Sequence, residues 1–251
     1  MLTLAIDTST KSAGIALLRD SDILSEMFFN LDVNHSLVLL PALDHLLRLS
    51  QMEAGGIDLF ACTVGPGSFT GLRVGASTVK GLALATGKPI AGVSTLEALA
   101  FNIISPEISV CPMLDAKKGQ VYTALYRTGR DYTLEKIETE RVTDVREFLC
   151  GVDEQVIFVG DGAAKYAGLI GEILPGKACF ASVSHQHVRA AVVGLLGRRK
   201  YSEGNILDSV TFAPAYLRAS EAEAKRFSRQ MPAERGEICH HRRISNIDKD
   251  C

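Results

Sequence analysis

Residues 7–19 have the sequence Asp-Thr-Ser-Thr-Lys-Ser-Ala-Gly-Ile-Ala-Leu-Leu-Arg, and residues 115–127 follow the same plan with Asp-Ala-Lys-Lys-Gly-Gln-Val-Tyr-Thr-Ala-Leu-Tyr-Arg. In both, an apolar strand ends in aspartate, a short loop carries lysine and glycine, and a strand containing Ala-Leu-x-Arg returns. A second pair, residues 64–67 (Val-Gly-Pro-Gly) and 159–162 (Val-Gly-Asp-Gly), occurs in the same order, each with a buried strand before a glycine turn. Repetition of this kind indicates a duplicated structural unit. We therefore predict an α/β fold of two related lobes, each a mixed sheet built on a three-stranded meander, with a ligand-binding cleft between them.

Hydrophobic periodicity assigns strands and helices to each lobe. The first half predicts strands at 2–6, 14–18, 23–28, 59–64 and 90–93, and helices at 36–52, 70–86 and 95–104. The second half predicts strands at 108–114, 121–126, 132–138, 156–159 and 178–182, and helices at 144–149, 163–174 and 184–200, the last capped by Ser184. The predicted N-terminal lobe spans residues 1–104 and is completed by part of 200–218, and the C-terminal lobe spans 105–200. Residues 219–251 are highly charged and have no apolar period, which predicts a flexible tail.

The composition is that of an ordinary globular protein. Its 251 residues include 27 Lys and Arg against 29 Asp and Glu, a net charge of -2, which argues against a strongly basic nucleic-acid-binding module. The six cysteines are scattered without a C-x-x-C pair, which argues against a zinc site or a secreted disulfide framework. The N-terminus lacks the basic region of a signal peptide, and the longest apolar stretch, 71–86, contains Arg73 and Lys80. We therefore predict a soluble, cytoplasmic protein with no membrane span.

The first candidate site is the tight turn at Asp7, Thr8 and Ser9. Backbone amides and hydroxyls in this turn could hold a phosphate while the aspartate positions a metal-bound water. An Asx turn within a hairpin accounts for the same residues equally well.

The second candidate site is the glycine-rich loop at 65–71, Gly-Pro-Gly-Ser-Phe-Thr-Gly. A strand, a glycine turn and a helix N-terminus form an arrangement that attracts anions. The loop is not a dinucleotide fingerprint, because its third glycine falls one place late, and no P-loop is present. The alternative is a rigid connector whose glycines permit close packing. With the first turn, the loop supplies the candidate cofactor-binding residues Asp7, Thr8, Ser9, Gly65, Gly67 and Ser68.

The predicted helix at 70–86 is rich in small residues. Gly71, Gly75 and Gly81 each cost about 1 kcal/mol relative to alanine inside a helix, so their presence needs a reason. Gly71 and Gly75 form one small ridge, and Gly81 belongs to a second ridge with Ser77 and Ala85. Such ridges permit the close approach of another helix. That helix could be 36–52 of the same chain or a helix of another subunit.

The chain resembles the TsaB (YeaZ) family from residue 1 to about residue 218. The resemblance rests on residues 4–9 (Leu-Ala-Ile-Asp-Thr-Ser), 65–75 (Gly-Pro-Gly-Ser-Phe-Thr-Gly-Leu-Arg-Val-Gly), 92–96 (Gly-Val-Ser-Thr-Leu) and 214–218 (Pro-Ala-Tyr-Leu-Arg). It implies a two-lobed fold of the actin/Hsp70/sugar-kinase (RNase H-like) superfamily. It also implies a role in the bacterial synthesis of threonylcarbamoyladenosine, the modified base beside the tRNA anticodon.

The resemblance implies a non-catalytic partner of a related TsaD-like enzyme, acting together with a TsaE-like ATPase. TsaD-like proteins bind a metal through a His-x-x-x-His motif, and Thr95 and Leu99 stand where its two histidines would be. Neither residue offers an imidazole ligand. The resemblance thus implies a scaffold subunit without catalytic residues, metal ligands or a required cofactor. ATP and a metal are expected in the partner subunits, and tRNA would bind only through the complex.

The resemblance also implies where the partner docks. In the family the first two helices of the N-terminal lobe form both the homodimer surface and the contact with TsaD, and here they are the helices at 36–52 and 70–86. The predicted interface residues are Leu39, Leu40, Leu43, Leu47, Gly71, Gly75, Thr78 and Leu82. Two alternative functions stay open: an ATP-dependent phosphotransferase or ATPase that uses Asp7, and a glycoprotease-like metallopeptidase.

Overall fold

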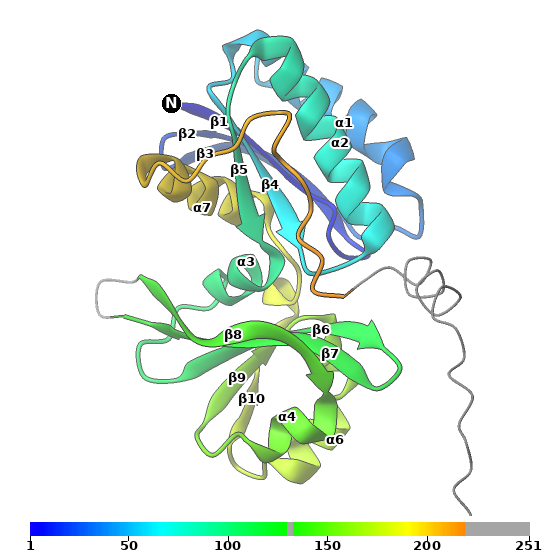
Figure 1. The fold of residues 1–251 in the computed structure, drawn as a ribbon, viewed down its shortest axis with the longest axis vertical. Helices are drawn as coiled ribbons and strands as arrows, with labels where there is room; N and C mark the ends of the chain where they lie inside the picture. The colour runs from blue at the N-terminus through cyan, green and yellow to red at the C-terminus, as the bar shows by residue number, and fades with distance from the viewer. Residues whose placement is uncertain (130–132, 219–251) are drawn as a thin grey trace, which may run out of the picture. The chain divides into compact units, whose positions relative to one another are not determined.

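Two five-stranded sheets of identical topology form the framework of the protein (Figure 1). The computed structural model describes residues 1–129 and 133–218, so the predicted tail at 219–251 lies outside the described residues. The strand orders are β3-β2-β1-β4-β5 and β8-β7-β6-β9-β10. In each sheet the first three strands form an antiparallel meander, and the last two add in parallel to the first. This repeated topology confirms the predicted pair of related α/β lobes.

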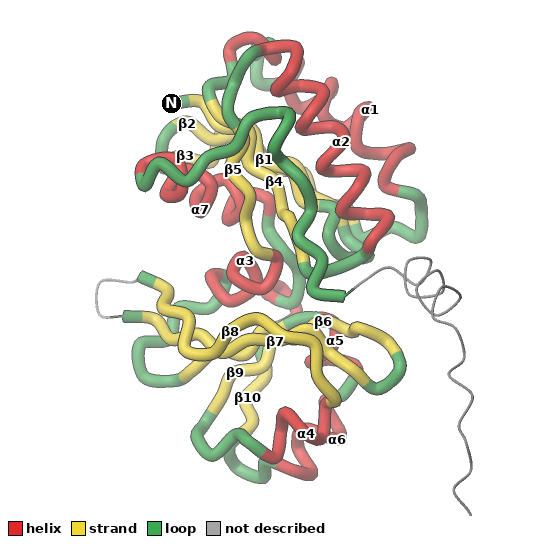
Figure 2. The backbone as a smooth tube through the Cα atoms, in the orientation of Figure 1, coloured by secondary structure: helices red, strands yellow, loops and turns green. Residues whose placement is uncertain are grey.

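The elements follow one another in the same order in both halves of the chain (Figure 2). The first half contains β1 (Leu2–Asp7), β2 (Ala13–Arg19), β3 (Asp22–Phe29), α1 (His35–Leu49), β4 (Leu59–Gly65), α2 (Phe69–Thr86), β5 (Ile90–Ser94) and α3 (Thr95–Phe101). The second contains β6 (Ser109–Lys117), β7 (Gln120–Thr128), β8 (Leu134–Asp144), α4 (Val145–Cys150), β9 (Val156–Val159), α5 (Asp161–Lys165), α6 (Ala167–Ile173), β10 (Ala178–Phe180) and α7 (Ala190–Ser202). Short 3-10 turns lie at Ala54–Gly56 and Val183–His185.

Strands β1, β2 and β4 of the first sheet are buried on both faces, with mainly large side chains on one face and small ones on the other. Leu4, Ile6 and Phe60 pack against α1 and α2 in one apolar cluster. Ala5 and Ala61, which alternate with them along β1 and β4, belong to the cluster that contains α7. Because successive side chains of a strand point to opposite faces, this alternation gives the sheet one face of large side chains and one face of small side chains.

Helix α7 packs on the face of the first sheet that carries the small side chains, although the sequence predicted α7 to belong to the C-terminal lobe. A Cβ added at Gly194 would lie 2.4 Å from Leu18 Cδ1, and one added at Gly197 would lie 2.5 Å from Ala61 Cβ. Glycine in the helix and alanine in the strands therefore let the two elements approach closely. The prediction that residues 105–200 form the C-terminal lobe is corrected at this point, because α7 covers the N-terminal sheet.

The start of α7 also differs from the sequence prediction. The helix begins at Ala190, and Ser184 lies in the preceding 3-10 turn instead of capping it. The segment before α7 is held by other bonds: Asn102 Nδ2 donates to the carbonyl of His187 at 2.8 Å, and the Gly160 backbone amide donates to Gln186 Oε1 at 2.7 Å. These contacts to both lobes hold the connection in a non-helical path.

Helix α2 has the ends that its sequence predicts. The Ser68 hydroxyl caps its N-terminus by accepting from the Gly71 amide at 3.2 Å, and Gly87 ends it with a left-handed φ of 69°. This helix contains the longest apolar stretch of the sequence. No helix among residues 1–129 and 133–218 is both long enough and apolar enough to cross a membrane.

Candidate functional site

The Asp7 carboxyl group ends β1 in the interior of the N-terminal lobe and is fully buried. Its Oδ1 atom accepts hydrogen bonds from the Ser9 hydroxyl at 2.6 Å, the Thr63 hydroxyl at 2.7 Å and the Ser9 amide at 3.1 Å. Its Oδ2 atom has no hydrogen-bond partner among the described residues. Burial raises the pKa of Asp7 above its ordinary value of 3.8, and the bonds from Ser9 and Thr63 offset only part of that rise.

The glycine-rich loop packs directly onto the turn that follows Asp7. The Ser68 amide donates to the Ser9 carbonyl at 2.6 Å, and the Thr8 hydroxyl donates to the Gly71 carbonyl at 2.7 Å. A Cβ at Gly67 would lie 2.1 Å from the Ser9 carbonyl oxygen, so only glycine fits there.

The structure therefore brings the turn at Asp7, Thr8 and Ser9 together with Gly67 and Ser68 of the loop, but it packs them against one another. The remaining candidate, Gly65, instead faces Ala215, whose carbonyl oxygen would lie 2.6 Å from a Cβ at Gly65. Hydroxyl groups that could have held a phosphate are already bonded within the chain. Of the alternatives for these two loops, the geometry favours the Asx turn and the rigid connector, with the glycines serving close packing.

Asp115, at the equivalent position of the second lobe, has a different electrostatic environment. Its Oδ1 accepts from the Lys117 amide at 3.0 Å, the same two-residue spacing as the bond from Ser9 to Asp7. Its Oδ2 lies 3.0 Å from Lys117 Nζ and 2.9 Å from Lys165 Nζ. Partial burial alone would raise the pKa of Asp115, but the hydrogen bonds from Lys165 and Lys117 outweigh it and hold the pKa below its ordinary value. The turn is thus the same in both lobes, but the Asp115 carboxylate is paired with two lysines while the Asp7 carboxyl group is buried without an ion pair among the described residues.

Replacing Asp7 by asparagine should remove a pH-dependent loss of stability. Because the pKa of Asp7 is raised on folding, the folded protein holds this proton more tightly than the unfolded chain, and wild-type stability should fall as the pH rises above 3.8. Asparagine keeps an oxygen for the bonds from Ser9 and Thr63 and carries no charge. Asp7→Asn should therefore be more stable than the wild type at neutral pH, with a difference that shrinks as the pH is lowered. Urea unfolding of both proteins across this pH range measures the effect, and a wild type that gains stability relative to the variant as the pH rises would contradict it.

The two positions that the TsaB resemblance places at the histidines of TsaD-like proteins lie in α3, in the protein interior. Thr95 and Leu99 are both fully buried. Between them, Glu97 donates its backbone amide to the Ser94 hydroxyl at 3.2 Å, which caps the N-terminus of α3, while its carboxylate pairs with Arg199 and Lys200 of α7. In residues 1–129 and 133–218, no group of three or more His, Cys, Asp or Glu side chains is placed to hold a metal ion.

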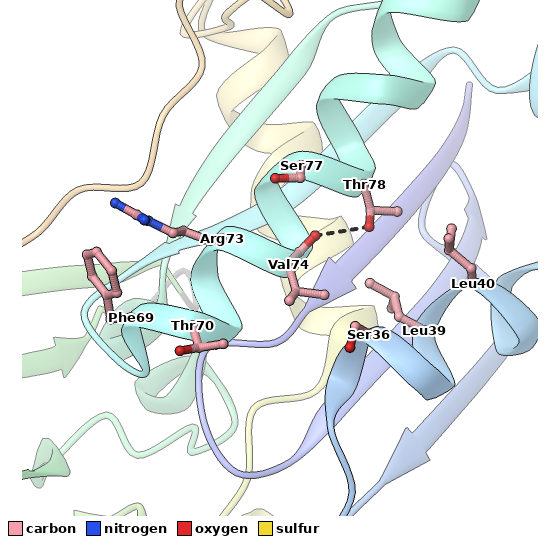
Figure 3. A pocket seen from close by; sticks show the side chains of 9 residues that line it. All are labelled: Ser36, Leu39, Leu40, Phe69, Thr70, Arg73, Val74, Ser77 and Thr78. Atoms are coloured by element: carbon pink, nitrogen blue, oxygen red, sulfur yellow. Dashed lines mark hydrogen bonds between the residues drawn. The ribbon is translucent and has the colours of Figure 1, made fainter.

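A groove of ≈ 480 Å³ lies between α1 and α2 on the outer side of the N-terminal lobe (Figure 3). Its lining is mainly apolar and hydroxyl-bearing, with one charged side chain: Ser36, Leu39, Leu40, Phe69, Thr70, Arg73, Val74, Ser77 and Thr78. Leu40 is 57% exposed and lies beside the other apolar lining residues, so the groove presents apolar surface to solvent. An apolar groove between two exposed helices is suited to binding the apolar face of a partner helix.

The predicted interface residues divide between this groove and the protein core. Leu39, Leu40 and Thr78 line the groove, and Leu47 and Leu82 lie half-buried on the same two helices. The other three have the side chain or Cβ position facing the chain's own interior, and Leu39, although it lines the groove, is also buried in the core beneath α1.

The three inward positions are Leu43, Gly71 and Gly75. Leu43 is buried in the core beneath α1. A Cβ at Gly71 would lie 2.0 Å from the Thr8 carbonyl oxygen, and one at Gly75 would lie 2.4 Å from Thr8 Oγ1. This small ridge of α2 thus packs against the turn after β1 and not against α1 or another subunit. The second ridge, Ser77 with Gly81 and Ala85, is exposed.

Most of the α2 side of the groove was not among the predicted interface residues. The missed residues are Ser36, Phe69, Thr70, Arg73, Val74 and Ser77. Their spacing was a usable signal, because positions 70, 73, 74, 77 and 78 follow the i, i+3, i+4, i+7, i+8 pattern of a single helix face. Ser36, Leu39 and Leu40 follow the same pattern on α1.

Similarity to known proteins covers nearly the whole of the described chain. The family model for "TsaD: tRNA N6-adenosine threonylcarbamoyltransferase" matches residues 23–226. The tRNA threonylcarbamoyladenosine biosynthesis protein TsaB of Bacillus subtilis (strain 168) is 34% identical over 227 residues, which cover 90% of this chain and 97% of that protein. The chain belongs to the TsaB family.

Other TsaB proteins agree with this assignment. The TsaB of Escherichia coli (strain K12) is 32% identical over 188 residues, 69% of this chain and 81% of that protein. The solved structure of YeaZ from Pseudomonas aeruginosa superposes with a TM-score of 0.73 at 26% identity, covering 86% of this chain and 99% of that one. The duplicated sheets and this likeness confirm the predicted fold of two related α/β lobes, each a mixed sheet flanked by helices.

Proposed function

We propose that this TsaB-family chain is a scaffold subunit that binds a TsaD-like enzyme through the groove between α1 and α2. The observation that supports this most directly is the groove, because it is an apolar surface open to solvent on α1 and α2. The opposite face of the same sheet is covered by α7. The match of this chain to the TsaD family model supports the choice of partner. A protein that shares the fold carries an equivalent helix pair, so the two chains can pack with like faces together, as subunits related by a two-fold axis do.

In this proposal the chain stabilises the active form of the partner, which transfers a threonylcarbamoyl group from its adenylate to a tRNA adenosine in the cytoplasm. The enclosed turn at Asp7 supports a role without nucleotide chemistry in this subunit, because its hydroxyls bond within the chain. Thr95 and Leu99 supply no imidazole for a metal. ATP and the metal then belong to the TsaD-like and TsaE-like subunits. The net charge of -2 fits a subunit that contacts tRNA only through the assembly.

The same groove accounts for a homodimer of the free chain. A second copy would bring an identical groove to the contact, which makes a closed, two-fold arrangement. The homodimer and the complex with the partner would then compete for one surface. Addition of the TsaD-like protein should therefore convert the homodimer into a heteromeric complex.

Size exclusion with light scattering, on this protein alone and mixed with the TsaD-like protein of the same organism, tests the proposal. We expect a dimer alone and a new complex in the mixture. Absence of a complex, even with ATP and the TsaE-like protein present, would refute the scaffold function. Tight binding of ATP and Mg²⁺ by the isolated chain, lost in Asp7→Ala, would instead support a phosphotransferase.

A further inference from the structure

The segment after α7 runs along the N-terminal lobe and reaches the end of the groove. Leu207 pairs with Ile90 of β5 in an antiparallel bridge, and the buried Phe212 accepts a hydrogen bond from Lys80 Nζ of α2 at 3.0 Å. Further on, the Ala215 amide donates to the Val64 carbonyl at 2.8 Å. Contacts along its whole length therefore fix this segment beside α2 (Figure 2).

Tyr216 of this segment contacts two residues that line the groove. Its ring lies 5.0 Å from the Phe69 ring, centroid to centroid, and its hydroxyl accepts a hydrogen bond from Arg73 Nε at 3.2 Å. The Arg73 guanidinium also stacks on Phe69, with Cζ 3.9 Å from the ring centroid. Phe69 and Arg73 extend from the α2 side away from α1 (Figure 3). With Tyr216, which contacts both, they form the outer rim of the groove.

Phe69 covers one face of the Arg73 guanidinium, and Tyr216 accepts from its Nε donor. The edge that carries Nη1 and Nη2 is left to bind another group. Arginine has five N–H donors, of which Tyr216 takes the single one on Nε. Within residues 1–129 and 133–218, no carboxylate forms an ion pair with Arg73. The Nη1 and Nη2 edge that remains has the geometry that binds a carboxylate or a phosphate with two parallel hydrogen bonds.

We propose that Arg73, oriented by Phe69 and Tyr216, binds a carboxylate of the docked TsaD-like partner and so helps to select that partner. The inference rests on the proposed docking at the groove and adds the chemistry of one contact. It also gives the segment at 214–218 a role, because Tyr216 positions the arginine from outside the groove.

The surroundings of Arg73 favour a protein carboxylate over a nucleic-acid phosphate. The other eight lining residues are apolar or hydroxyl-bearing, and Arg73 is the only charged one. Binding of a nucleic-acid backbone uses several Lys and Arg side chains along one path. A single arginine on the rim of an apolar surface is instead typical of a protein interface, where it contributes specificity and association rate.

The experiment measures the affinity of the TsaD-like protein for wild-type chain, Arg73→Gln and Tyr216→Phe across a series of salt concentrations. The matched controls are Arg146→Gln, on an exposed arginine of α4, and Tyr201→Phe, on an exposed tyrosine of α7. We expect Arg73→Gln to bind about tenfold more weakly, as loss of a charge-assisted pair predicts, and to lose much of the salt dependence. Tyr216→Phe keeps the ring contact and should show a smaller loss, while both controls should bind like the wild type.

Replacement of each exposed Asp or Glu on the partner's equivalent helices, one at a time, identifies the carboxylate. One of these changes should weaken binding to the wild type and leave binding to Arg73→Gln unaltered. If the wild type binds the partner and Arg73→Gln binds within twofold of it, the carboxylate contact is wrong while the scaffold function stands. If Arg73→Gln weakens only the binding of tRNA to the assembled complex, Arg73 contacts a phosphate and the proposal is overturned. If the wild type does not bind the partner, the docking proposal itself has failed.

Discussion

Replacing Gly71 by alanine should lower the free energy of unfolding by about 3 kcal/mol or more, a large effect for adding one methyl group. The new Cβ would lie 2.0 Å from the Thr8 carbonyl oxygen, which belongs to the backbone and cannot rotate away. Relief of this clash would move α2 from the turn after β1 and break the hydrogen bond from the Thr8 hydroxyl to the Gly71 carbonyl. Urea unfolding monitored by circular dichroism measures the loss.

Gly81→Ala on the same helix is the matched control. No atom lies within 4 Å of its Cβ position apart from the helix's own neighbours, and the residue is exposed. Alanine there should raise the free energy of unfolding by about 0.5–1 kcal/mol, because it restricts the unfolded chain without a clash. Equal effects of the two substitutions would contradict the packing assigned to Gly71.

The position of Gly75 restricts how the docking surface can be tested. A Cβ there would meet Thr8 Oγ1 at 2.4 Å, so a bulky substitution such as Gly75→Arg should disrupt the fold. Loss of partner binding in that variant would report unfolding and not a blocked interface. A useful variant must change a residue whose side chain already points outward.

The duplication could be predicted from the sequence because each copy keeps the same residue types at its turns. Asp7 and Asp115 each accept a hydrogen bond from the amide two residues later, so the same turn is encoded twice by an aspartate after an apolar run. A Cβ at Gly67 would lie 2.1 Å from the Ser9 carbonyl oxygen, in the turn after β1, and one at Gly162 would lie 2.8 Å from the Met113 carbonyl oxygen in β6. Both glycine turns therefore approach another backbone segment closely. Local chemistry of this kind survives in sequence even where the surrounding side chains differ.

The placement of α7 and the function of the α2 glycines depend on contacts between distant parts of the chain. Gly71 and Gly75 indicate a close approach, but their spacing does not say whether a helix, a loop or another subunit makes it. Helix α7 follows the second sheet in sequence and packs on the first, where Gly197 meets Ala61. The last part of β8, up to Asp144, has no apolar run and is a strand because it pairs with β7. Each of these outcomes is decided by the partner element and not by the local pattern.

Leu40→Glu should reduce the affinity for the TsaD-like partner by about 100-fold or more while leaving the fold intact. Leu40 lines the groove and is 57% exposed in the free chain, so a charge there stays solvated until a partner covers it. Binding would then bury a carboxylate among Leu39 and Val74, and the cost of desolvating it falls on the complex alone. Isothermal titration of the partner into wild type and variant measures the loss.

Val183→Glu tests whether that loss belongs to the groove or to any exposed apolar residue. Val183 is 85% exposed in the turn before α7 and does not line the groove, so its variant should bind the partner like the wild type. Unfolding free energies of both variants should stay within about 0.5 kcal/mol of the wild type, as is usual for surface changes. If Leu40→Glu also converts the free homodimer into a monomer, the homodimer and the complex share one surface. If it leaves the affinity for the partner unchanged, docking does not use the groove between α1 and α2, and the contact assigned to Arg73 falls with it.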